Sequence, residues 1–248
     1  MNSLLSRDHF SGHAVDYAKF RPGYPDALFD WIATQTTNHD LAWDCGCGNG
    51  QASAPLADRY RRVVGTDFSP QQIAQTRPHP RIEYRVAPAE QSELADASAD
   101  LVTIAQALHW FDFDRFYAEV RRVLRPGGII VAWTYQLLRS DSTVDALLMD
   151  FYGRVLGAYW PPERKWVDAG YHGMPFPFAA IDTPAFEIRL QWTQADLLAY
   201  LGTWSATQRF RKAEGTDPIP ALADRLTTVW GEGTREIVWP IAMLAGHA

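Results

Sequence analysis

The sequence predicts an α/β fold, in which a doubly wound, mostly parallel sheet of seven strands has helices on both faces and carries an aromatic-rich cap insertion. Short apolar runs alternate with amphipathic stretches over residues 41–135, which is typical of parallel strands joined by crossover helices. The first apolar run ends in a glycine-rich turn, a frequent ligand site in such sheets. Aromatic residues and prolines then gather within residues 136–183, which indicates an insertion that caps the sheet.

The elements are expected in the following order. Apolar runs bounded by polar or glycine-containing segments predict strands at 41–44, 63–66, 82–86, 100–105, 129–133, 186–192 and 235–242. Amphipathic stretches predict helices at 26–36, 51–60, 70–77, 113–124 and 141–156, from 194 onward, and at 219–230. Ser69 before Pro70 is the expected cap of the third of these helices. The run Arg125-Pro126-Gly127-Gly128 predicts a helix end before the fifth strand.

The composition argues against several classes of partner. The 248 residues include 23 Lys and Arg against 29 Asp and Glu, a formal charge of −6, and no basic run exceeds two residues. This charge pattern does not favour a nucleic-acid partner, and no segment resembles a membrane span. Cys45 and Cys47 are too close for an unstrained disulfide, so we expect a reducing, cytoplasmic location.

The glycine turn, Asp44-Cys45-Gly46-Cys47-Gly48-Asn49-Gly50-Gln51, admits three ligand classes. A dinucleotide site needs a third glycine where Gln51 stands, and Asp44 would repel a pyrophosphate. A zinc site needs four ligands, so we expect no metal and interpret both cysteines as small packing residues. A cationic ligand without phosphate remains, because Asp44 would attract it.

This turn resembles motif I of the class I S-adenosylmethionine-dependent methyltransferases, whose fold is Rossmann-like. The resemblance implies that Gly46, Cys47 and Gly48 wrap the methionine part of S-adenosylmethionine, with Asp44 near its positive charges. Asp67, at the end of the second strand, would then accept hydrogen bonds from the ribose hydroxyls.

Further segments resemble the same family. Phe68 would lie along the ribose and adenine, and Ala89 and Glu90 lie in a segment similar to the adenine-binding turn, where Glu90 has a structural role as its alternative. Gln106 follows the fourth strand and would face the cofactor. The pattern Gln106-Ala107-Leu108-His109 differs from the Asn/Asp-Pro-Pro-Tyr of the nucleobase methyltransferases.

The chain instead resembles the small-molecule branch that includes trans-aconitate methyltransferase. The segment Phe10-x6-Tyr17-x2-Phe20-Arg21-Pro22-x-Tyr24-Pro25 and the segment Ala107-x-His109-Trp110-Phe111-Asp112 carry this resemblance. It implies that Tyr17 and Arg21 meet the cofactor carboxylate, whereas the alternative is a packing segment. The expected division of the single domain 1–248 is a cofactor-covering segment 1–40, a cofactor-binding half 41–135, the cap insertion 136–183 and a part completing the sheet, 184–248.

The resemblance implies methyl transfer to a small acceptor, a carboxylate, hydroxyl or amine, by in-line displacement that gives S-adenosylhomocysteine. His109 is the candidate general base because histidine titrates near neutrality, with a hydrogen-bonded wall residue as its alternative role. Trp110, Trp166 and Trp204 are candidate acceptor-pocket residues or packing residues. Several scattered cations are candidates to bind a substrate carboxylate, with ordinary surface residues as their alternative: Arg139, Arg164, Lys165, Arg209 and Arg211. A non-catalytic regulator or scaffold that binds S-adenosylmethionine or a nucleoside is the alternative function.

Overall fold

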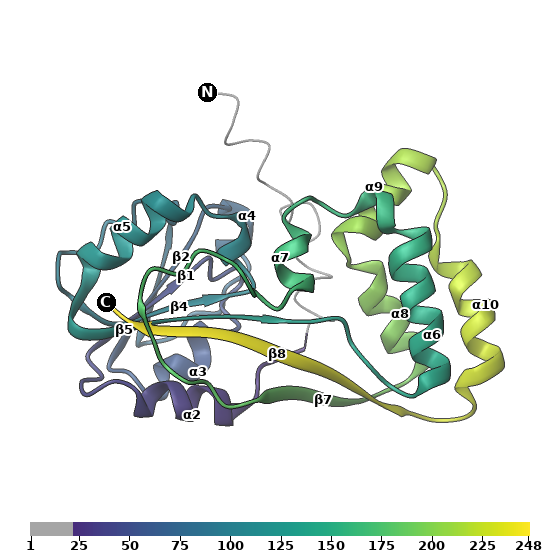
Figure 1. Ribbon diagram of the computed structural model, residues 1–248, viewed down its shortest axis with the longest axis horizontal. Coiled ribbons are helices and arrows are strands. Elements are labelled where there is room, and N and C mark those ends of the chain that lie inside the picture. The colour runs from purple at the N-terminus through teal and green to yellow at the C-terminus, as the bar shows by residue number, and fades with distance from the viewer. Residues whose placement is uncertain (1–21) are drawn as a thin grey trace.

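The computed structural model describes residues 22–248, which form a sheet covered by helices on both faces and a helical cluster beside it (Figure 1). The strand order is β3-β2-β1-β4-β5-β8-β6, and β7 also pairs with β8. The strands are β1 (Leu41–Cys45), β2 (Arg62–Asp67), β3 (Ile82–Val86), β4 (Ala99–Ala105), β5 (Leu124–Tyr135), β6 (Ala179–Ala180), β7 (Phe186–Trp192) and β8 (Arg235–His247). The α/β fold and its mostly parallel sheet are therefore as predicted.

The central strand β1 is buried along its whole length, which explains why its sequence is an almost continuous apolar run. It pairs in parallel with β2 on one side and with β4 on the other. In this register Cys45 lies opposite Thr66, and Asp44 lies opposite Thr103. The carboxyl ends of three strands, and the loops that follow them, therefore meet at one edge of the sheet.

Three α-helices of the sheet-containing part follow the predicted order but differ in length from prediction. They are α3 (Ser53–Ala57), α4 (Pro70–Ile73) and α5 (Phe113–Val123), and α2 (Asp26–Thr34) precedes them. The helices predicted at 51–60 and 70–77 are thus too long. Pro78 and Pro80 disfavour helix in the residues before them, and the start of β2 at Arg62 limits α3. Ser69 caps α4 as predicted, since its Oγ accepts a hydrogen bond from the Gln72 N–H at 3.3 Å.

The last strand, β8, is longer than the predicted 235–242. Its first half, from Arg235 to Ile241, pairs with β7, and its second half continues to His247 along β5. Two residues, Ala179–Ala180, add the short strand β6 against Gly246 and His247, so that the sheet has eight strands where seven were expected. A two-residue strand has no periodicity that a sequence pattern can reveal.

The helical cluster consists of α6 (Ser142–Asp150), α8 (Gln194–Gly202), α9 (Ser205–Glu214) and α10 (Ile219–Trp230). Helix α6 continues into a π-helical turn, Phe151–Val155. The short helix α7 (Arg164–Asp168) lies between the cluster and the sheet (Figure 1). The cluster thus takes helices both from residues 136–183 and from residues 194–230.

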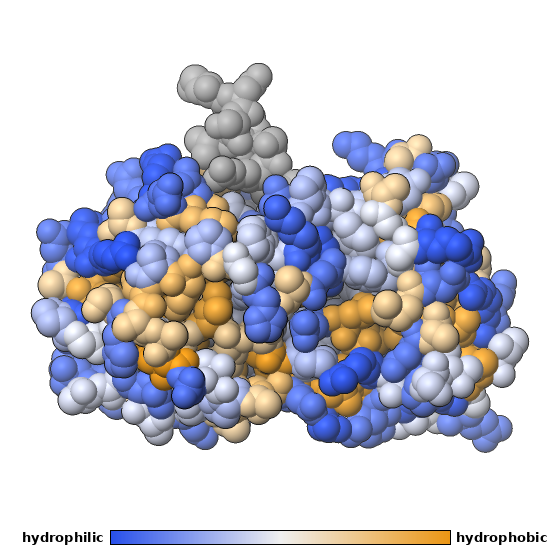
Figure 2. Space-filling model, in the orientation of Figure 1, coloured by the Kyte–Doolittle hydropathy of each residue, from blue (hydrophilic) through white to orange (hydrophobic). Residues whose placement is uncertain are grey.

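Buried aromatic rings join the cluster to the sheet. Trp239 of β8 lies in an edge-to-face arrangement with Tyr200 of α8, at 5.6 Å between ring centroids, and both residues belong to the larger hydrophobic core. On the surface, hydrophobic and hydrophilic residues alternate in patches over both parts (Figure 2). Among the described helices, none is long and apolar enough to cross a membrane.

Candidate active site

The glycine turn after β1 requires glycine for two separate reasons. Gly46, Gly48 and Gly50 have φ values of 67°, 55° and 90°, a region that side chains disfavour. A Cβ on Gly46 would also lie 2.6 Å from the Cβ of Ala107, and one on Gly50 would collide with the Tyr84 hydroxyl. The turn is therefore pressed between the loop after β4 and a side chain of β3.

Asp44 lies beneath this turn and is completely buried. Its carboxylate accepts hydrogen bonds from Ser53 Oγ at 2.5 Å and from Thr103 Oγ1 at 3.1 Å. Burial raises the pKa of Asp44 to about 6, and the nearby carboxylate of Asp67 contributes to the rise. The side chain thus joins β4 to the start of α3 and places a buried carboxylate next to the turn.

Asp67 ends β2 and joins two loops at the edge of the sheet. One carboxylate oxygen accepts a hydrogen bond from the Gly48 N–H at 2.9 Å, and the other accepts one from the Ser69 N–H at 2.8 Å. Phe68 beside it is 41% exposed, and Val86 at the end of β3 is 53% exposed, although both are apolar. This edge therefore presents a carboxylate next to uncovered apolar surface, which suits a ligand with sugar hydroxyls and a flat ring.

The loop after β3 supports this edge. Ala89 is buried, and Ala87 donates its N–H to the carbonyl of Asp67 at 3.0 Å. Glu90 accepts a hydrogen bond from the N–H of Asp112, the residue that caps α5, at 3.1 Å. This hydrogen bond is a structural contact, as expected for the alternative role of Glu90 that the sequence left open.

The cysteines are buried in the described structure. Burial raises the pKa of Cys45 and of Cys47 well above the usual thiol value. Both are therefore protonated at neutral pH, which does not suit a metal ligand or a nucleophile. Within residues 22–248, no group of three or more His, Cys, Asp or Glu side chains is arranged to hold a metal ion.

Gln106 follows β4 with a φ of 58°, a left-handed conformation that is strained for a residue with a side chain. Its N–H donates to the Trp133 carbonyl at 2.9 Å, and its Oε1 accepts from Thr134 Oγ1 at 2.9 Å. Neighbouring strand β5 thus holds both the backbone and the side chain of Gln106 at this point.

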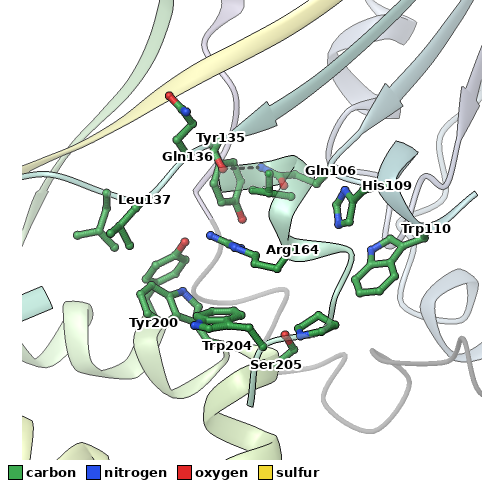
Figure 3. A pocket seen from close by; sticks show the side chains of 14 residues that line it. Gln106, His109, Trp110, Tyr135, Gln136, Leu137, Arg164, Tyr200, Trp204 and Ser205 are labelled. Atoms are coloured by element: carbon green, nitrogen blue, oxygen red, sulfur yellow. Dashed lines mark hydrogen bonds between the residues drawn. The ribbon is translucent and has the colours of Figure 1, made fainter. Parts of the chain in front are cut away.

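A pocket opens between this loop and the helical cluster (Figure 3). Arg164 lies in its middle, between Gln106 and Tyr135 on one side and Tyr200 and Trp204 on the other (Figure 3). The pocket is lined by Gln106, His109, Trp110, Tyr135, Gln136, Leu137, Leu138, Trp160, Pro161, Arg164, Val167, Tyr200, Trp204 and Ser205.

Comparison with known proteins assigns this arrangement to a family. Residues 43–132 match the family model of a methyltransferase domain. A Dictyostelium discoideum protein named as a methyltransferase is 33% identical over 223 residues, which cover 88% of this chain and 85% of that protein. A solved structure from Anaeromyxobacter dehalogenans, described as a candidate type II methyltransferase, is 47% identical with a TM-score of 0.86, and the match covers 92% of this chain and 98% of that one. The chain belongs to the class I S-adenosylmethionine-dependent methyltransferases.

Other relatives agree with this assignment. An uncharacterized methyltransferase of Mycobacterium tuberculosis is 38% identical to this methyltransferase over 185 residues, 73% of this chain and 69% of that protein. A solved Bacillus halodurans structure has only 17% identity, with a TM-score of 0.50 over 89% of this chain and 96% of that one, and shows the shared fold alone.

Besides the residues of the glycine turn and the sheet edge described above, the predicted site residues of the methyltransferase fall into three groups. His109, Trp110 and Trp204 line the pocket together with Gln106. Trp166 is not among the pocket residues, and its ring packs against Phe113 at 6.3 Å between centroids. Tyr17 and Arg21 lie outside the described residues.

His109 does not have the near-neutral titration that the sequence suggested. Burial, together with the positive charge of Arg164, lowers the pKa of His109 to about 3. Its Nδ1 lies 3.2 Å from the hydroxyl of Tyr171, within hydrogen-bonding distance. The imidazole is therefore neutral at physiological pH, and its conjugate acid is too strong for the ring to be an effective base there.

Of the five scattered cations considered in the sequence, only Arg164 lines the pocket among the described residues. Lys165 contacts the ring of Trp166, and Arg211 pairs with Asp217. Arg164 lies 58 positions from Gln106 in the chain, so no local motif connects the two.

The two hydrogen-bond partners of Asp44, Ser53 and Thr103, were also missed from the sequence, because neither belongs to a recognisable motif. Only the strand register brings Thr103 beside Asp44.

Proposed function

We propose that the chain transfers a methyl group from S-adenosylmethionine to a small organic acceptor bound in the pocket between the sheet edge and the helical cluster. One observation carries this proposal: the glycine turn and the pocket share a wall. Gly46 is in contact with Ala107, and the adjoining residues Gln106 and His109 line the pocket. A ligand on the turn and a ligand in the pocket would therefore meet at this loop.

The residues at the edge of the sheet fit the cofactor. The exposed ring of Phe68 suits the adenosine, and the carboxylate of Asp67 beside it is an acceptor type that suits ribose hydroxyls. Gln72 Oε1 is buried without a hydrogen-bond partner in the described structure and lies 3.8 Å from where a Cβ on Gly48 would stand. An acceptor atom left unpaired beside the turn favours a ligand that brings a donor.

When bound, the cofactor supplies a methyl group already activated by a sulfonium charge. The protein then has to orient the acceptor in line with it, and alignment provides much of the rate enhancement. Asp44, Gly46, Cys47 and Gly48 would hold the methionine part, and Ala89 and its turn the adenine. We propose that neutral His109 orients the acceptor by hydrogen bonding.

The branch of the family, the covering segment and the location are also proposals. The N-terminal pattern and the Ala107-x-His109-Trp110 segment support a small-molecule enzyme similar to trans-aconitate methyltransferase, with no nucleic-acid partner. In it, Tyr17 and Arg21 of segment 1–40 would meet the cofactor carboxylate. The lack of a disulfide framework supports a cytoplasmic location.

Calorimetric titration with S-adenosylhomocysteine tests the proposal. We expect the wild type to bind and Asp67→Ala to lose about 1.5–3 kcal/mol of binding free energy, the value of hydrogen bonds to a charged group. Asp58→Ala is the control, because Asp58 is an exposed carboxylate whose ion pair with Arg81 lies away from the turn. Absence of binding to the wild type would refute the proposal, and equal loss in both variants would remove Asp67 from the site.

A further inference from the structure

The charge of the pocket is unusual for one lined mainly by aromatic and aliphatic side chains. Arg164 is the only cationic side chain in its described lining, and no Asp or Glu is part of that lining. Since His109 is neutral at physiological pH, the described pocket has a net positive charge. A partly enclosed cation in a lining that contains no carboxylate favours an anionic ligand.

The guanidinium of Arg164 is fixed from one side. Its Nε donates to the Tyr152 hydroxyl at 2.8 Å and lies 3.1 Å from the Asp168 carboxylate. The same group lies over the ring of Trp160, at 4.6 Å from the centroid. A π-helical turn, a feature frequent at functional sites, carries Tyr152.

The two terminal nitrogens of Arg164 have no hydrogen-bond partner among the described residues, and Figure 3 shows the guanidinium directed into the pocket. Parallel donors on a held guanidinium match the two oxygens of a carboxylate. Asp168 reaches only Nε, and its own side chain is 46% exposed, so water screens its charge.

One further wall of the pocket is aromatic and aliphatic. The rings of Trp160 and Trp204 lie 5.4 Å apart, and those of Tyr200 and Trp204 lie 5.9 Å apart. Leu137 and Val167 complete this side of the pocket. Such a wall favours a flat or branched hydrocarbon body. Elsewhere the described lining offers the neutral polar side chains of Gln106, Gln136 and Ser205, but no second cation for a further carboxylate on the ligand.

The chemistry of the pocket also limits the nucleophile. A neutral hydroxyl or an ammonium must lose a proton, yet the described lining contains no carboxylate or lysine, and His109 has a pKa of about 3. A carboxylate is already an anion at neutral pH and needs no base.

We infer that the acceptor is a monocarboxylic acid with an apolar body, that Arg164 binds its carboxylate, and that a carboxylate oxygen is the methylated atom. The inference rests on the proposed function. The carboxylate oxygen forms a new O–C bond while the S–C bond of the donor breaks and leaves its electron pair on sulfur. The products are a neutral methyl ester and S-adenosylhomocysteine, and no proton is released.

A matched substrate panel tests the chemical class. The probes are 3-phenylpropionate, its primary amide, the corresponding amine and a tricarboxylate of similar size, each incubated with S-adenosylmethionine and analysed by mass spectrometry. We expect a base-labile methyl ester from 3-phenylpropionate and at least 10-fold less product from the others. Faster methylation of the amine or of the tricarboxylate would overturn the inference.

Binding tests the role of Arg164 separately from turnover. Tryptophan fluorescence, to which Trp160 and Trp204 contribute, follows titration of 3-phenylpropionate into the protein saturated with S-adenosylhomocysteine. We expect Arg164→Met to raise the Kd at least 30-fold and Arg164→Lys to raise it less. Arg154→Met is the matched control, because Arg154 lies on the same π-helical turn as Tyr152, pairs with Asp150 of α6 and is 70% exposed. The Kd of this variant should stay within twofold of the wild-type value.

Unchanged S-adenosylhomocysteine affinity of Arg164→Met, measured by calorimetry, shows that the variant is folded. An equal Kd for 3-phenylpropionate in Arg164→Met and in the wild type would overturn the role of Arg164. If the wild type binds S-adenosylhomocysteine but neither binds nor methylates the acid, this inference fails while the proposed function stands. If it does not bind S-adenosylhomocysteine, the proposed function itself fails.

Discussion

Asp67 accepts a hydrogen bond of 2.9 Å from the backbone N–H of Gly48, and this bond joins the ends of β2 and β1. The same carboxylate accepts a bond from the N–H of Ser69, where α4 begins. One side chain therefore fixes the glycine turn and the following helix relative to each other. The shape of the turn is held by the fold before any ligand arrives.

Replacing Gly46 should destabilise the protein more than replacing Gly48. Both residues have positive φ, so each alanine should cost about 1 kcal/mol in backbone conformation. Only at Gly46 would the new Cβ collide with Ala107, which should add about 1–3 kcal/mol. Urea unfolding of Gly46→Ala and Gly48→Ala measures the difference. Equal losses in the two variants would show that the contact with Ala107 is not tight.

The burial of Asp44 should be visible in the pH dependence of stability. Its folded pKa of about 6 lies above the unfolded value of 3.8, so the folded state binds the proton more tightly. The penalty for burying the charged form is full above pH 6 and is relieved as the pH falls toward 3.8. A shift of this size corresponds to about 3 kcal/mol.

The variant Asp44→Asn lacks this titration. Relative to the wild type, its free energy of unfolding should decrease by about 2–2.5 kcal/mol between pH 7 and pH 4, because the wild type regains most of this stability over that range. Chemical denaturation at a series of pH values measures this, with Asp58→Asn as an exposed control that should parallel the wild type. Parallel curves for Asp44→Asn would mean that Asp44 is not protonated in this range.

The low pKa of His109 predicts that the pH–rate profile shows no change caused by titration of this histidine near neutral pH. Because the imidazole is neutral above about pH 3, kcat/KM should not change between pH 5.5 and 8 through its titration. His109→Gln, which retains hydrogen-bonding capacity, should lower the rate without changing the shape of the profile. If the plot of kcat/KM against pH has an inflection near pH 6.5 in the wild type and none in His109→Gln, His109 acts as a general base and this prediction is wrong.

Glu119 should stabilise the packing of α5 against the loop that follows β3. It is 9% exposed and accepts hydrogen bonds from the N–H and the Oγ of Ser92, and it pairs with Arg122. Glu119→Ala should cost about 3 kcal/mol, since it leaves buried donors unpaired. Asp96→Ala removes the exposed partner of the same arginine and should cost less than about 1 kcal/mol. Thermal unfolding of both variants checks this, and similar losses would contradict it.

The order of the elements, and the sheet edge that carries the glycine turn and Asp67, were predictable because they depend on local sequence. Strand β1 is recognisable as a buried apolar run, and glycines at 46, 48 and 50 are required by positive φ within a single turn. Asp67 falls at the end of the next strand, and parallel strands bring such ends to the same edge. The family resemblance drew on these same short segments.

The helical cluster and the pocket were not predictable in this way. Arg164 was one of five scattered cations in the sequence, and only the docking of α7 beside Gln106 and His109 gives it a position in the pocket. The helices around it come from two separate segments, and their contacts have no periodic signature. The neutral state of His109 was not predictable either, because it depends on burial and on the charge of Arg164, which is distant in the sequence.

The sequence by itself therefore determined the fold class, the glycine turn and the acidic residue at the end of β2, since propensity, periodicity and backbone conformation act over a few residues. The tertiary structure alone decided which cation faces the pocket, that Asp44 lies buried beneath the turn, and that His109 is neutral. These properties arise from desolvation and from charges on distant segments, and both exist only once the chain has folded.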